Sequence, residues 1–360
     1  MSAKSQAIST PGQAVAAVAL DAAERASLVA HEASDRAKAS AERAKASVLQ
    51  SLPGSQSKAT WEHVALYAFI ILPTAAFLAA IPMLWGSHIG PVDLILFAIF
   101  YGISAHGITV GFHRYFTHGS FKANRGLKIG LAIAGSLAVQ GPITRWVADH
   151  RRHHAFSDQE GDPHSPWVYG GGTKNIAKGF WHSHMGWLFD PEQTNQQRFA
   201  PDLLADPDIQ KVDHHFPTLV VVTMVLPGLL GGLITWSWVG GLQAFFWASL
   251  VRVFLLHHVT WSINSICHIV GKKPFASRDQ SRNVWPLAVL SMGESWHNLH
   301  HAEPTAARHG VDRGQIDSSA RLIWTFEKLG WATDVKWAKP ARLATKRTDS
   351  AAAKGLSEAA

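Results

Sequence analysis

The sequence predicts an all-α integral membrane protein with four transmembrane helices in two hairpins and a cytosolic helical cap that carries a histidine-rich dimetal site. Two observations predict this fold class. Long stretches of the 360-residue chain contain no charged residue, and the whole chain is 47% hydrophobic and only 16% charged, a balance that indicates membrane-embedded surface. Histidine is frequent, with 21 copies, and several of them recur at the same spacing.

Charge-free stretches give the positions of the four spans. Residues 64–92 contain no Asp, Glu, Lys or Arg, and a helix of about 20 such residues crosses a bilayer. A second charge-free stretch covers 94–112. A third, 216–251, is about twice the length of one span and contains a turn near 238–241. We therefore predict the spans at about these positions: 65–86, 93–112, 216–236 and 241–262.

The distribution of basic residues predicts the orientation. The links within each pair of spans contain no Lys or Arg, whereas residues 113–215 contain eleven. By the positive-inside rule, both termini and this middle segment, with its site, face the cytoplasm. The net charge of +7 is compatible with nucleic acid, an anionic membrane surface or an anionic substrate. Because the charge lies beside the spans, we expect membrane lipids and no nucleic acid as partners.

The remaining segments complete the predicted organisation. Residues 1–60 are a polar, Ala-rich segment without the apolar core and cleavage site of a signal peptide, so we expect a mobile or interfacial tail. Residues 61–340 form the membrane domain, and residues 341–360 are expected to be disordered. The apolar stretch 129–144 is a rival fifth span, but it is short and contains Gln140, Gly141 and Pro142. We interpret this stretch as re-entrant or interfacial.

The histidine spacing indicates the chemistry. Eight histidines form one cluster with the spacing His-x4-His and two with the spacing His-x-x-His-His: His113 and His118; His150, His153 and His154; His297, His300 and His301. Residues at i, i+3 and i+4 share a helix face, so each of the latter two clusters directs three imidazoles to one point. Eight histidines exceed what one ion binds, and two metal ions are expected. Imidazole suits iron, zinc and copper alike.

These clusters and four shorter motifs resemble the membrane fatty acyl desaturase family, of the type that acts at position 9. The motifs are Trp146-Val-Ala-Asp-His150, Asp162-Pro-His164, His184-Met-Gly-Trp187 and Gly293-Glu-Ser-Trp-His297. The resemblance covers residues 60–335 and implies a di-iron centre held by nine histidines and one asparagine that acts through water. The implied ligands are the eight clustered histidines, His268 and, through water, Asn264.

Helix length agrees with this ligand set. Residues 264 and 268 share a helix face, and a helix over 241–268 is about 42 Å long. The hydrocarbon core of a bilayer is only about 30 Å thick, so the end with His268 projects toward the other histidines. Arg252 then falls within the membrane, and we expect its side chain to face the bundle interior or the substrate cavity.

The resemblance also implies the activity. We expect an O2-dependent desaturase of the stearoyl-CoA 9-desaturase type, which introduces a cis double bond at position 9 of a saturated acyl chain, with acyl-CoA favoured over acyl-lipid. Two iron ions are the cofactors, and O2 is the co-substrate. The chain contains neither a Gly-rich dinucleotide fingerprint nor a cysteine cluster. Electrons therefore come from an external donor, for which ferredoxin with its reductase is expected.

Three sets of residues are predicted to act beside the metal ligands. Three tryptophans lie close to the motifs in the sequence, and we expect them to line the acyl tunnel: Trp146, Trp187 and Trp261. Residues expected to orient the ligand imidazoles are Asp149, Asp162, His184 and Glu294. Basic residues that could dock an acidic carrier or the substrate's phosphates, or face the membrane, are Lys122, Arg125, Lys128, Arg151 and Arg152.

The head group and the reaction leave alternatives open. The sequence Phe189-Asp-Pro-Glu-Gln193 and Ala148 stand where the animal branch of the family carries basic residues, so the acyl chain could instead be carried by a lipid or a carrier protein. A hydroxylase or monooxygenase of the same histidine-box superfamily would share the irons. A metal-handling membrane protein is the remote alternative, since its ligands would lie within the spans rather than after them.

Overall fold

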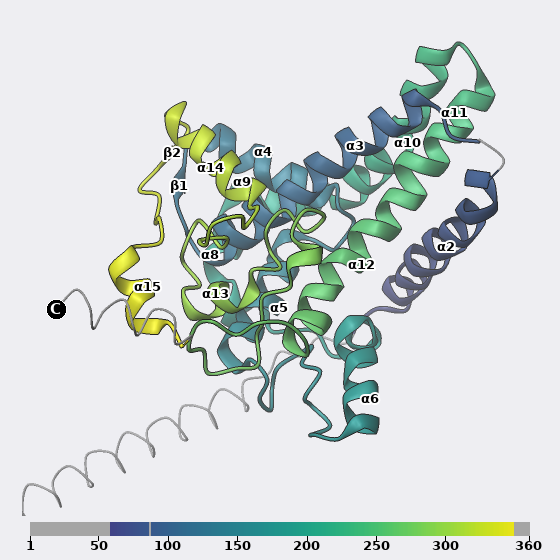
Figure 1. Ribbon diagram of the computed structural model, residues 1–360. Helices are drawn as coiled ribbons and strands as arrows, with labels where there is room; N and C mark the ends of the chain where they lie inside the picture. Colours follow the sequence, from purple (N-terminus) through teal and green to yellow (C-terminus); the bar gives the residue numbers. More distant parts are fainter. Residues whose placement is uncertain (1–57, 86–87, 349–360) are drawn as a thin grey trace, which may run out of the picture. The chain divides into compact units, whose positions relative to one another are not determined.

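The computed structural model describes residues 58–85 and 88–348, which are mostly helical (Figure 1). Four helices are long and apolar enough to cross a membrane: Glu62–Met83, Pro91–Thr117, Phe216–Thr235 and Trp238–His268. The predicted class, an all-α membrane protein with four spans and a histidine-rich cluster, is confirmed. The two-hairpin arrangement and the cytosolic cap stay predictions, and the N-terminal tail up to residue 57 lies outside the described residues.

The four spans are built from consecutive helical segments. The first is α2 (Thr60–Trp85), and the second is α3 (Pro91–His106) continued by the π-helical η1 (Gly107–Thr117). The third is α10 (Phe216–Thr235). The fourth consists of α11 (Trp238–Phe245), the π-helical η3 (Phe246–Val251), α12 (Arg252–Ser265) and the short η4 (Ile266–His268).

Shorter elements fill the segments between and after these spans. Between the second and third spans lie β1 (Lys122–Ala123), α4 (Arg125–Ser136), α5 (Ile143–Phe156), α6 (Thr173–His184), η2 (Gly186–Phe189), α7 (Gln196–Phe199), α8 (Pro201–Leu204) and α9 (Pro207–His214). After the fourth span lie η5 (Trp285–Leu287), α13 (His297–Ala302), α14 (Ser318–Lys328), β2 (Ala332–Thr333) and α15 (Pro340–Lys346). β1 and β2 pair antiparallel, with Lys122 opposite Thr333.

The fourth span occupies the centre of the helix packing. Its η3 segment packs against α2, α3 and α10, and its α12 segment packs against α2, α3 and α6 (Figure 1). α10 packs most extensively against α11. Large apolar side chains remain exposed on the outer helices, as Ile71 of α2 (58%) and Leu233 of α10 (65%) illustrate. Apolar surface of this extent on membrane-crossing helices is suited to contact with lipid.

Close packing between η1 and α4 fixes the end of the second span. A Cβ atom at Gly107 of η1 would lie 2.2 Å from backbone atoms of Ala134 in α4. At Gly135, a Cβ would lie 2.3 Å from the ring of Phe112. Only glycine allows backbones to approach this closely. The position of η1, which carries His113, is therefore set by its contact with α4.

The apolar stretch 129–144 does not form a membrane-crossing helix. α4 ends at Ser136, and α5 begins at Ile143. Between them, Val139 and Gly141 have positive φ angles of 61° and 104°, which no right-handed helix contains. The structure agrees with the rejection of a fifth span here.

Arg252 is fully buried in the fourth span. Its guanidinium donates to the carbonyl oxygen of Ala248 at 2.8 Å, to Ser104 Oγ at 3.2 Å and to Thr223 Oγ1 at 3.0 Å. A charge within a membrane protein is tolerated when internal partners satisfy it in this way. The side chain of Arg252 lies in the bundle interior, which is one of the two placements predicted for it.

The start of the C-terminal segment differs from the prediction. Residues 341–360 were expected to be disordered, but α15 is helical as far as Lys346. Leu343 packs against a cluster that contains the buried Phe275. Arg342 Nη2 and Lys346 Nζ lie 2.7 and 2.8 Å from carboxylate oxygens of Glu303. These contacts order the polar helix, and residues 349–360 lie outside the described residues.

Candidate metal centre and substrate cavity

Four parts of the chain bring the nine predicted histidine ligands together, and all nine are buried or half-buried. The second span supplies His113 from η1 and His118 just beyond it. The fourth span supplies His268 at its end. The helix α5 supplies His150, His153 and His154. The helix α13 supplies His297, His300 and His301.

Polar side chains fix the two helices with the His-x-x-His-His spacing. Asp213 of α9 accepts hydrogen bonds from the backbone N–H groups of Ile143 at 2.7 Å and Thr144 at 3.1 Å. It thereby satisfies N–H groups that the start of α5 leaves without helical partners. Asn298 of α13 donates to the carbonyl oxygen of Phe275 at 3.0 Å and accepts from its N–H at 2.8 Å. Both helices are therefore held by residues distant in the sequence.

The nine histidines form two groups, and within each group the possible ligand atoms lie within 4.8 Å of one another. The five-histidine group consists of His113, His118, His150, His154 and His300. The four-histidine group consists of His153, His268, His297 and His301. α5 and α13 each contribute to both groups, so the two sites share their supporting helices.

Carboxylates contact the Nδ1 atoms of four of these imidazoles. The pairs and distances are His113 with Glu294 at 2.5 Å, His153 with Asp162 at 3.0 Å, His268 with Asp158 at 2.8 Å, and His301 with Asp279 at 2.6 Å. In the last three pairs the Nδ1 atom is hydrogen-bonded to the carboxylate. A proton held there leaves Nε2 with a lone pair that can bind a metal. Histidine–carboxylate pairs of this kind are typical of metal ligands and their supports.

The Nε2 atoms of the four-histidine group converge. Those of His268 and His301 both lie 3.0 Å from Nε2 of His297. Nε2 of His153 is buried and has no hydrogen-bond partner among the described residues. Because carboxylates hold the protons of His268 and His301 on Nδ1, both Nε2 lone pairs meet Nε2 of His297, which can donate at most one proton. A cation that accepts these lone pairs removes the conflict, so the donor set fits a metal ion that prefers imidazole.

The Nε2 atoms of the five-histidine group also converge. Nε2 of His300 lies 3.0 Å from Nε2 of His113 and 2.9 Å from Nε2 of His154. Nε2 of His154 in turn lies 3.2 Å from Nε2 of His150. Nε2 of His118 is buried without a hydrogen-bond partner among residues 58–85 and 88–348. The residues therefore fit two metal ions, one for each group.

Burial keeps five of these imidazoles in the neutral form that metal binding requires. It lowers the pKa of His150, His154, His297 and His300 well below the ordinary value, and the neighbouring histidines lower these pKa values further. For His301, burial lowers the pKa to about 4, although Asp279 opposes this shift. At neutral pH these nitrogen atoms are available as ligands.

Of the four residues predicted to orient the ligand imidazoles, two contact such an imidazole. Asp162 and Glu294 do so, as described above. His184 instead contacts Ser265 Oγ at 2.9 Å and His258 Nδ1 at 3.0 Å, both on α12. Asp149 lies in the wall of a cavity next to the histidines, and no contact between its carboxylate and a ligand imidazole is present in the described residues.

Sequence reasoning missed Asp158 and Asp279. Their imidazole partners, His268 and His301, lie 110 and 22 positions away. No helical spacing links either pair, so only the folded chain reveals them.

A buried ion network supports Glu294. Arg114, which is fully buried, lies 3.2 Å from Glu294 Oε1 and 3.1 Å from Asp317 Oδ1. It also contacts His309 Nδ1 at 3.0 Å. Burial raises the pKa of Glu294 to about 8, a shift that Arg114 opposes and Asp317 increases. Asp317 caps the start of α14 by accepting from the N–H of Ala320 at 2.8 Å, so the network joins η1 to α14.

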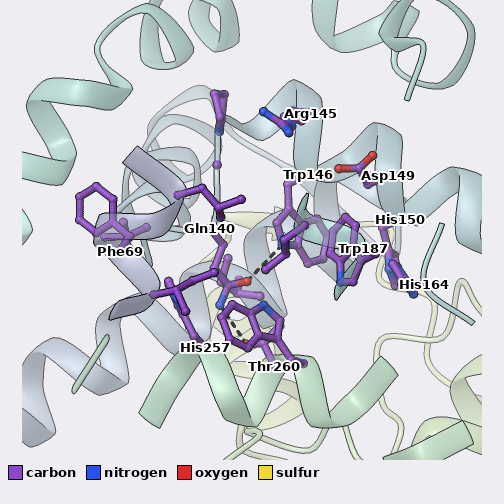
Figure 2. Close-up of a pocket in the computed structure, with 18 of the residues that line it drawn as sticks. Phe69, Gln140, Arg145, Trp146, Asp149, His150, His164, Trp187, His257 and Thr260 are labelled. Carbon is purple, nitrogen blue, oxygen red and sulfur yellow. Dashed lines mark hydrogen bonds between the residues drawn. The ribbon is translucent and has the colours of Figure 1, made fainter. Parts of the chain in front are cut away.

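An apolar cavity of about 540 Å³ adjoins the histidines (Figure 2). All three tryptophans predicted to line an acyl tunnel are in its wall: Trp146, Trp187 and Trp261. The wall also contains members of both histidine groups and the predicted asparagine: His113, His150, His297 and Asn264. The volume lies in the usual range of small-molecule sites. In Figure 2, His150 and His164 lie toward one end of the view and Phe69 toward the other.

Hydrogen bonds hold one wall of this cavity in place. Trp146 Nε1 donates to Gln140 Oε1 at 3.2 Å, and Gln140 Nε2 donates to Thr260 Oγ1 at 2.9 Å (Figure 2). These contacts link α5 to α12 through the segment after α4. The indole ring of Trp146 is thereby fixed beside His150, with ring centroids 5.1 Å apart.

A more polar hollow of about 410 Å³, which we call the vestibule, shares wall residues such as Asp149 and Trp187 with the cavity. Three cations line it, and each has protein partners. Lys58 Nζ donates to the carbonyl oxygens of Leu188 and Asp190, both at 2.6 Å. Arg145 lies 3.5 Å from Glu62, and Arg152 donates to the carbonyl oxygen of Gly161 at 2.8 Å.

Four membrane-crossing helices and two histidine groups beside an apolar cavity define a membrane protein with a site suited to metal-dependent chemistry on an apolar substrate. The chain belongs to the fatty acid desaturase family, whose model, "Fatty acid desaturase", matches residues 90–314. It is thus an oxidoreductase that acts on fatty acyl chains, in a family whose members are generally di-iron dependent.

Curated relatives cover most of the chain. A hex-5-enoyl-(acyl-carrier protein) acetylenase from Moorena producens (strain JHB) is 41% identical over 288 residues, which cover 79% of this chain and 88% of that protein. An sn-1 stearoyl-lipid 9-desaturase from Anabaena variabilis is 37% identical, with 75% of this chain and 92% of that protein covered. Delta-9 acyl-lipid desaturase 1 from Arabidopsis thaliana is 36% identical, with 79% and 88% covered.

The contact between Asp279 and His301 predicts an effect on metal affinity. The substitution Asp279→Asn removes the charge that holds the proton on His301 Nδ1, so we expect iron to bind about 10–100-fold more weakly. Iron retained per chain after dialysis against a graded chelator series measures this change. Asp334→Asn, at the exposed ion pair with Lys122, is the control and should retain iron like the unmodified chain. Equal retention in Asp279→Asn would contradict the assignment.

Proposed function

We propose that this chain is an O2-dependent desaturase that introduces a cis double bond at position 9 of a saturated acyl chain. The nine histidines hold two iron ions in this proposal, and Asn264 contributes through water. The observation that carries it is the apolar cavity, whose wall contains His113 and His150 of the five-histidine group and His297 of the four-histidine group. An acyl chain in this cavity reaches both candidate metal sites.

The protein's own part in the reaction is positioning. Iron bound by the two groups supplies the activation of O2 and the removal of hydrogen from two adjacent methylenes. The cavity wall holds the acyl chain so that one carbon pair lies beside the histidines. Trp146, fixed through Gln140, restricts the chain's path past His150. The largely apolar wall also excludes water from the reacting carbons.

The parts of the cavity wall that α2 and α10 supply favour a membrane lipid as the carrier of the acyl chain. Residues of α2, such as Ala65 and Phe69, line one side, and residues of α10, such as Val220 and Val221, line another. The side chain of Val221 is 60% exposed on a membrane-crossing helix. An acyl chain can therefore enter between α2 and α10 from the surrounding lipid without leaving the bilayer.

The vestibule supports the same choice of substrate. CoA carries several phosphates, which proteins bind with available cations. Lys58, Arg145 and Arg152 in the vestibule are each engaged by protein oxygens. The relatives from Anabaena variabilis and Arabidopsis thaliana are named for acyl-lipid substrates. We therefore propose an acyl-lipid, where the sequence alone favoured acyl-CoA, with the site on the cytoplasmic side and electrons from an external carrier.

The reaction predicts a change in the fatty acids of a host cell. Expression of the intact chain together with ferredoxin and its reductase should produce new cis-9 monounsaturated acids. His300→Ala should abolish them while the protein stays in the membrane, because His300 contacts two other members of its group. His214→Ala, which changes an exposed histidine, is the matched control.

Mass spectrometry fixes the double-bond positions in this experiment. Hydroxylated acids would instead support an oxygenase, and acetylenic acids would support the reaction named for the Moorena producens relative. An unchanged profile with all electron-transfer proteins present would contradict the proposed function.

Entry between α2 and α10 predicts a preference for lipid-bound acyl chains over acyl-CoA. This preference can be measured with purified protein in lipid nanodiscs. Stearoyl groups in the nanodisc lipid should be desaturated faster than added stearoyl-CoA. Val221→Trp should reduce lipid turnover, on the order of tenfold, because the larger ring obstructs the approach of the chain. Val225→Trp, an exposed position on the same helix outside the cavity wall, is the control. Faster turnover of stearoyl-CoA would contradict an acyl-lipid substrate.

A further inference from the structure

We propose that an acidic one-electron carrier protein docks on the cationic loop, which we define as residues 271–282, and delivers electrons to the metal centre there. This inference rests on the proposed function, because desaturation with O2 needs an external reductant. The balanced reaction is R–CH2–CH2–R′ + O2 + 2 e⁻ + 2 H⁺ → R–CH=CH–R′ + 2 H2O. The acyl chain loses two electrons and two protons as its two C–H bonds break. The carrier supplies the other two electrons, one at a time.

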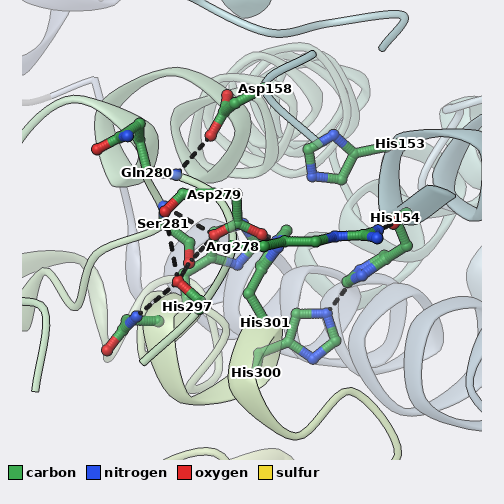
Figure 3. A network of polar contacts seen from close by, with 12 residues as sticks. His153, His154, Asp158, Arg278, Asp279, Gln280, Ser281, His297, His300 and His301 are labelled. Carbon is green, nitrogen blue, oxygen red and sulfur yellow. Dashed lines mark hydrogen bonds and ion pairs between the residues drawn. The ribbon is translucent and has the colours of Figure 1, made fainter. Parts of the chain in front are cut away.

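The cationic loop contacts both histidine groups directly (Figure 3). The Arg278 side chain donates to the carbonyl oxygen of His154, a member of the five-histidine group. Asp279 Oδ2 lies 2.6 Å from Nδ1 of His301, a member of the four-histidine group. Arg278 is itself exposed. One or two hydrogen-bonded contacts therefore separate a partner on this surface from each candidate metal site.

A second connection runs through the next residue of the loop. The N–H of Gln280 donates to Asp158 Oδ2 at 2.7 Å, and the same carboxylate oxygen lies 2.8 Å from Nδ1 of His268 (Figure 3). Gln280 is exposed, whereas Asp279 is buried. The loop is thus a thin layer of protein over the histidines rather than a remote surface.

The charge of the loop fits an acidic partner. It contains the cations Lys272, Lys273, Arg278 and Arg282 and one acid, Asp279. That acid is buried against His301, so the loop keeps a net positive charge that its exposed residues present. Within residues 58–85 and 88–348, no carboxylate lies within 4.0 Å of the charged nitrogen atoms of these four cations. Uncompensated positive charge of this kind attracts acidic proteins and orients them on approach.

Most of the basic residues that the sequence suggested for docking are compensated by carboxylates instead. Four of the five form ion pairs with aspartates at 2.6 to 2.7 Å: Lys122, Arg125, Lys128 and Arg151. The fifth, Arg152, donates to the carbonyl oxygen of Gly161 at 2.8 Å. The cations of α15 nearest the loop, Arg342 and Lys346, share Glu303. The cationic loop therefore differs from these other basic positions.

The loop is held in a fixed position relative to the metal centre. Lys272 and Asn283 exchange two backbone hydrogen bonds, at 3.0 and 2.7 Å. Asn298, beside the ligand His297, accepts from and donates to the backbone of Phe275. A carrier bound on this surface would meet the histidines at a constant separation, which electron transfer requires for a constant rate.

Stopped-flow mixing under anaerobic conditions tests the proposal. The iron-loaded chain in nanodiscs is mixed with a reduced, acidic plant-type ferredoxin, and ferredoxin oxidation is followed without acyl turnover. Lys272→Glu should lower the second-order rate constant by about tenfold and weaken its dependence on ionic strength. Lys174→Glu, at an exposed position on α6, should leave the rate constant unchanged. Equal rate constants for Lys272→Glu and the intact chain, or equal losses in both variants, would overturn the docking surface.

Two further readouts separate this inference from the proposed function. Dithionite-reduced protein should give the same single-turnover yield of desaturated product in Lys272→Glu and in the intact chain, since the substitution leaves the metal centre intact. No product from any variant, with a normal Lys272 effect on ferredoxin oxidation, would overturn the desaturase activity but keep the docking surface. Loss of binding to anionic vesicles in Lys272→Glu, with an unchanged ferredoxin rate constant, would assign the loop to the membrane and overturn the carrier.

Discussion

The structure depends on the convergence of nine imidazoles in two groups. Nε2 of His268 and of His301 both lie 3.0 Å from Nε2 of His297; one proton on His297 cannot satisfy both lone pairs, whereas a cation between the three rings can. In the proposed function, metal binding is coupled to the folding of this region, because the histidines come from the second span, the fourth span, α5 and α13. For His153, His268 and His301, a carboxylate beside Nδ1 leaves Nε2 facing the other imidazoles, so buried acids such as Asp158 belong to the candidate site as much as the histidines do.

Contacts made by residues other than the histidines make this convergence possible. Gly107 and Gly135 allow η1 and α4 to approach closely, which positions His113. Asp213 of α9 caps the start of α5 and so fixes the helix whose histidines point into the two groups. Asn298 fixes α13. The apolar cavity adjoins the histidines and is also lined by the first and third spans, so in the proposed function substrate access and metal binding share one scaffold.

Local patterns predicted the fold class, four spans and the eight clustered histidines, because hydropathy and the i, i+3, i+4 spacing are properties of neighbouring residues. His268 came only from the family resemblance, since its segment has no repeated spacing. Asp158 and Asp279 could not be predicted, because their contacts with His268 and His301 depend on the tertiary fold. The expected disorder of residues 341–360 was wrong for α15, whose order comes from packing on Phe275 and from Glu303.

The central claim is that the two histidine groups hold two iron ions. Metal analysis of the purified, iron-loaded chain, combined with Mössbauer spectroscopy, tests it most directly. The account predicts two iron ions per chain in two nitrogen-rich environments, and the loss of one or both signals when His153 or His300 is replaced by Ala. One ion per chain, a different metal, or two irons retained in both variants would contradict it.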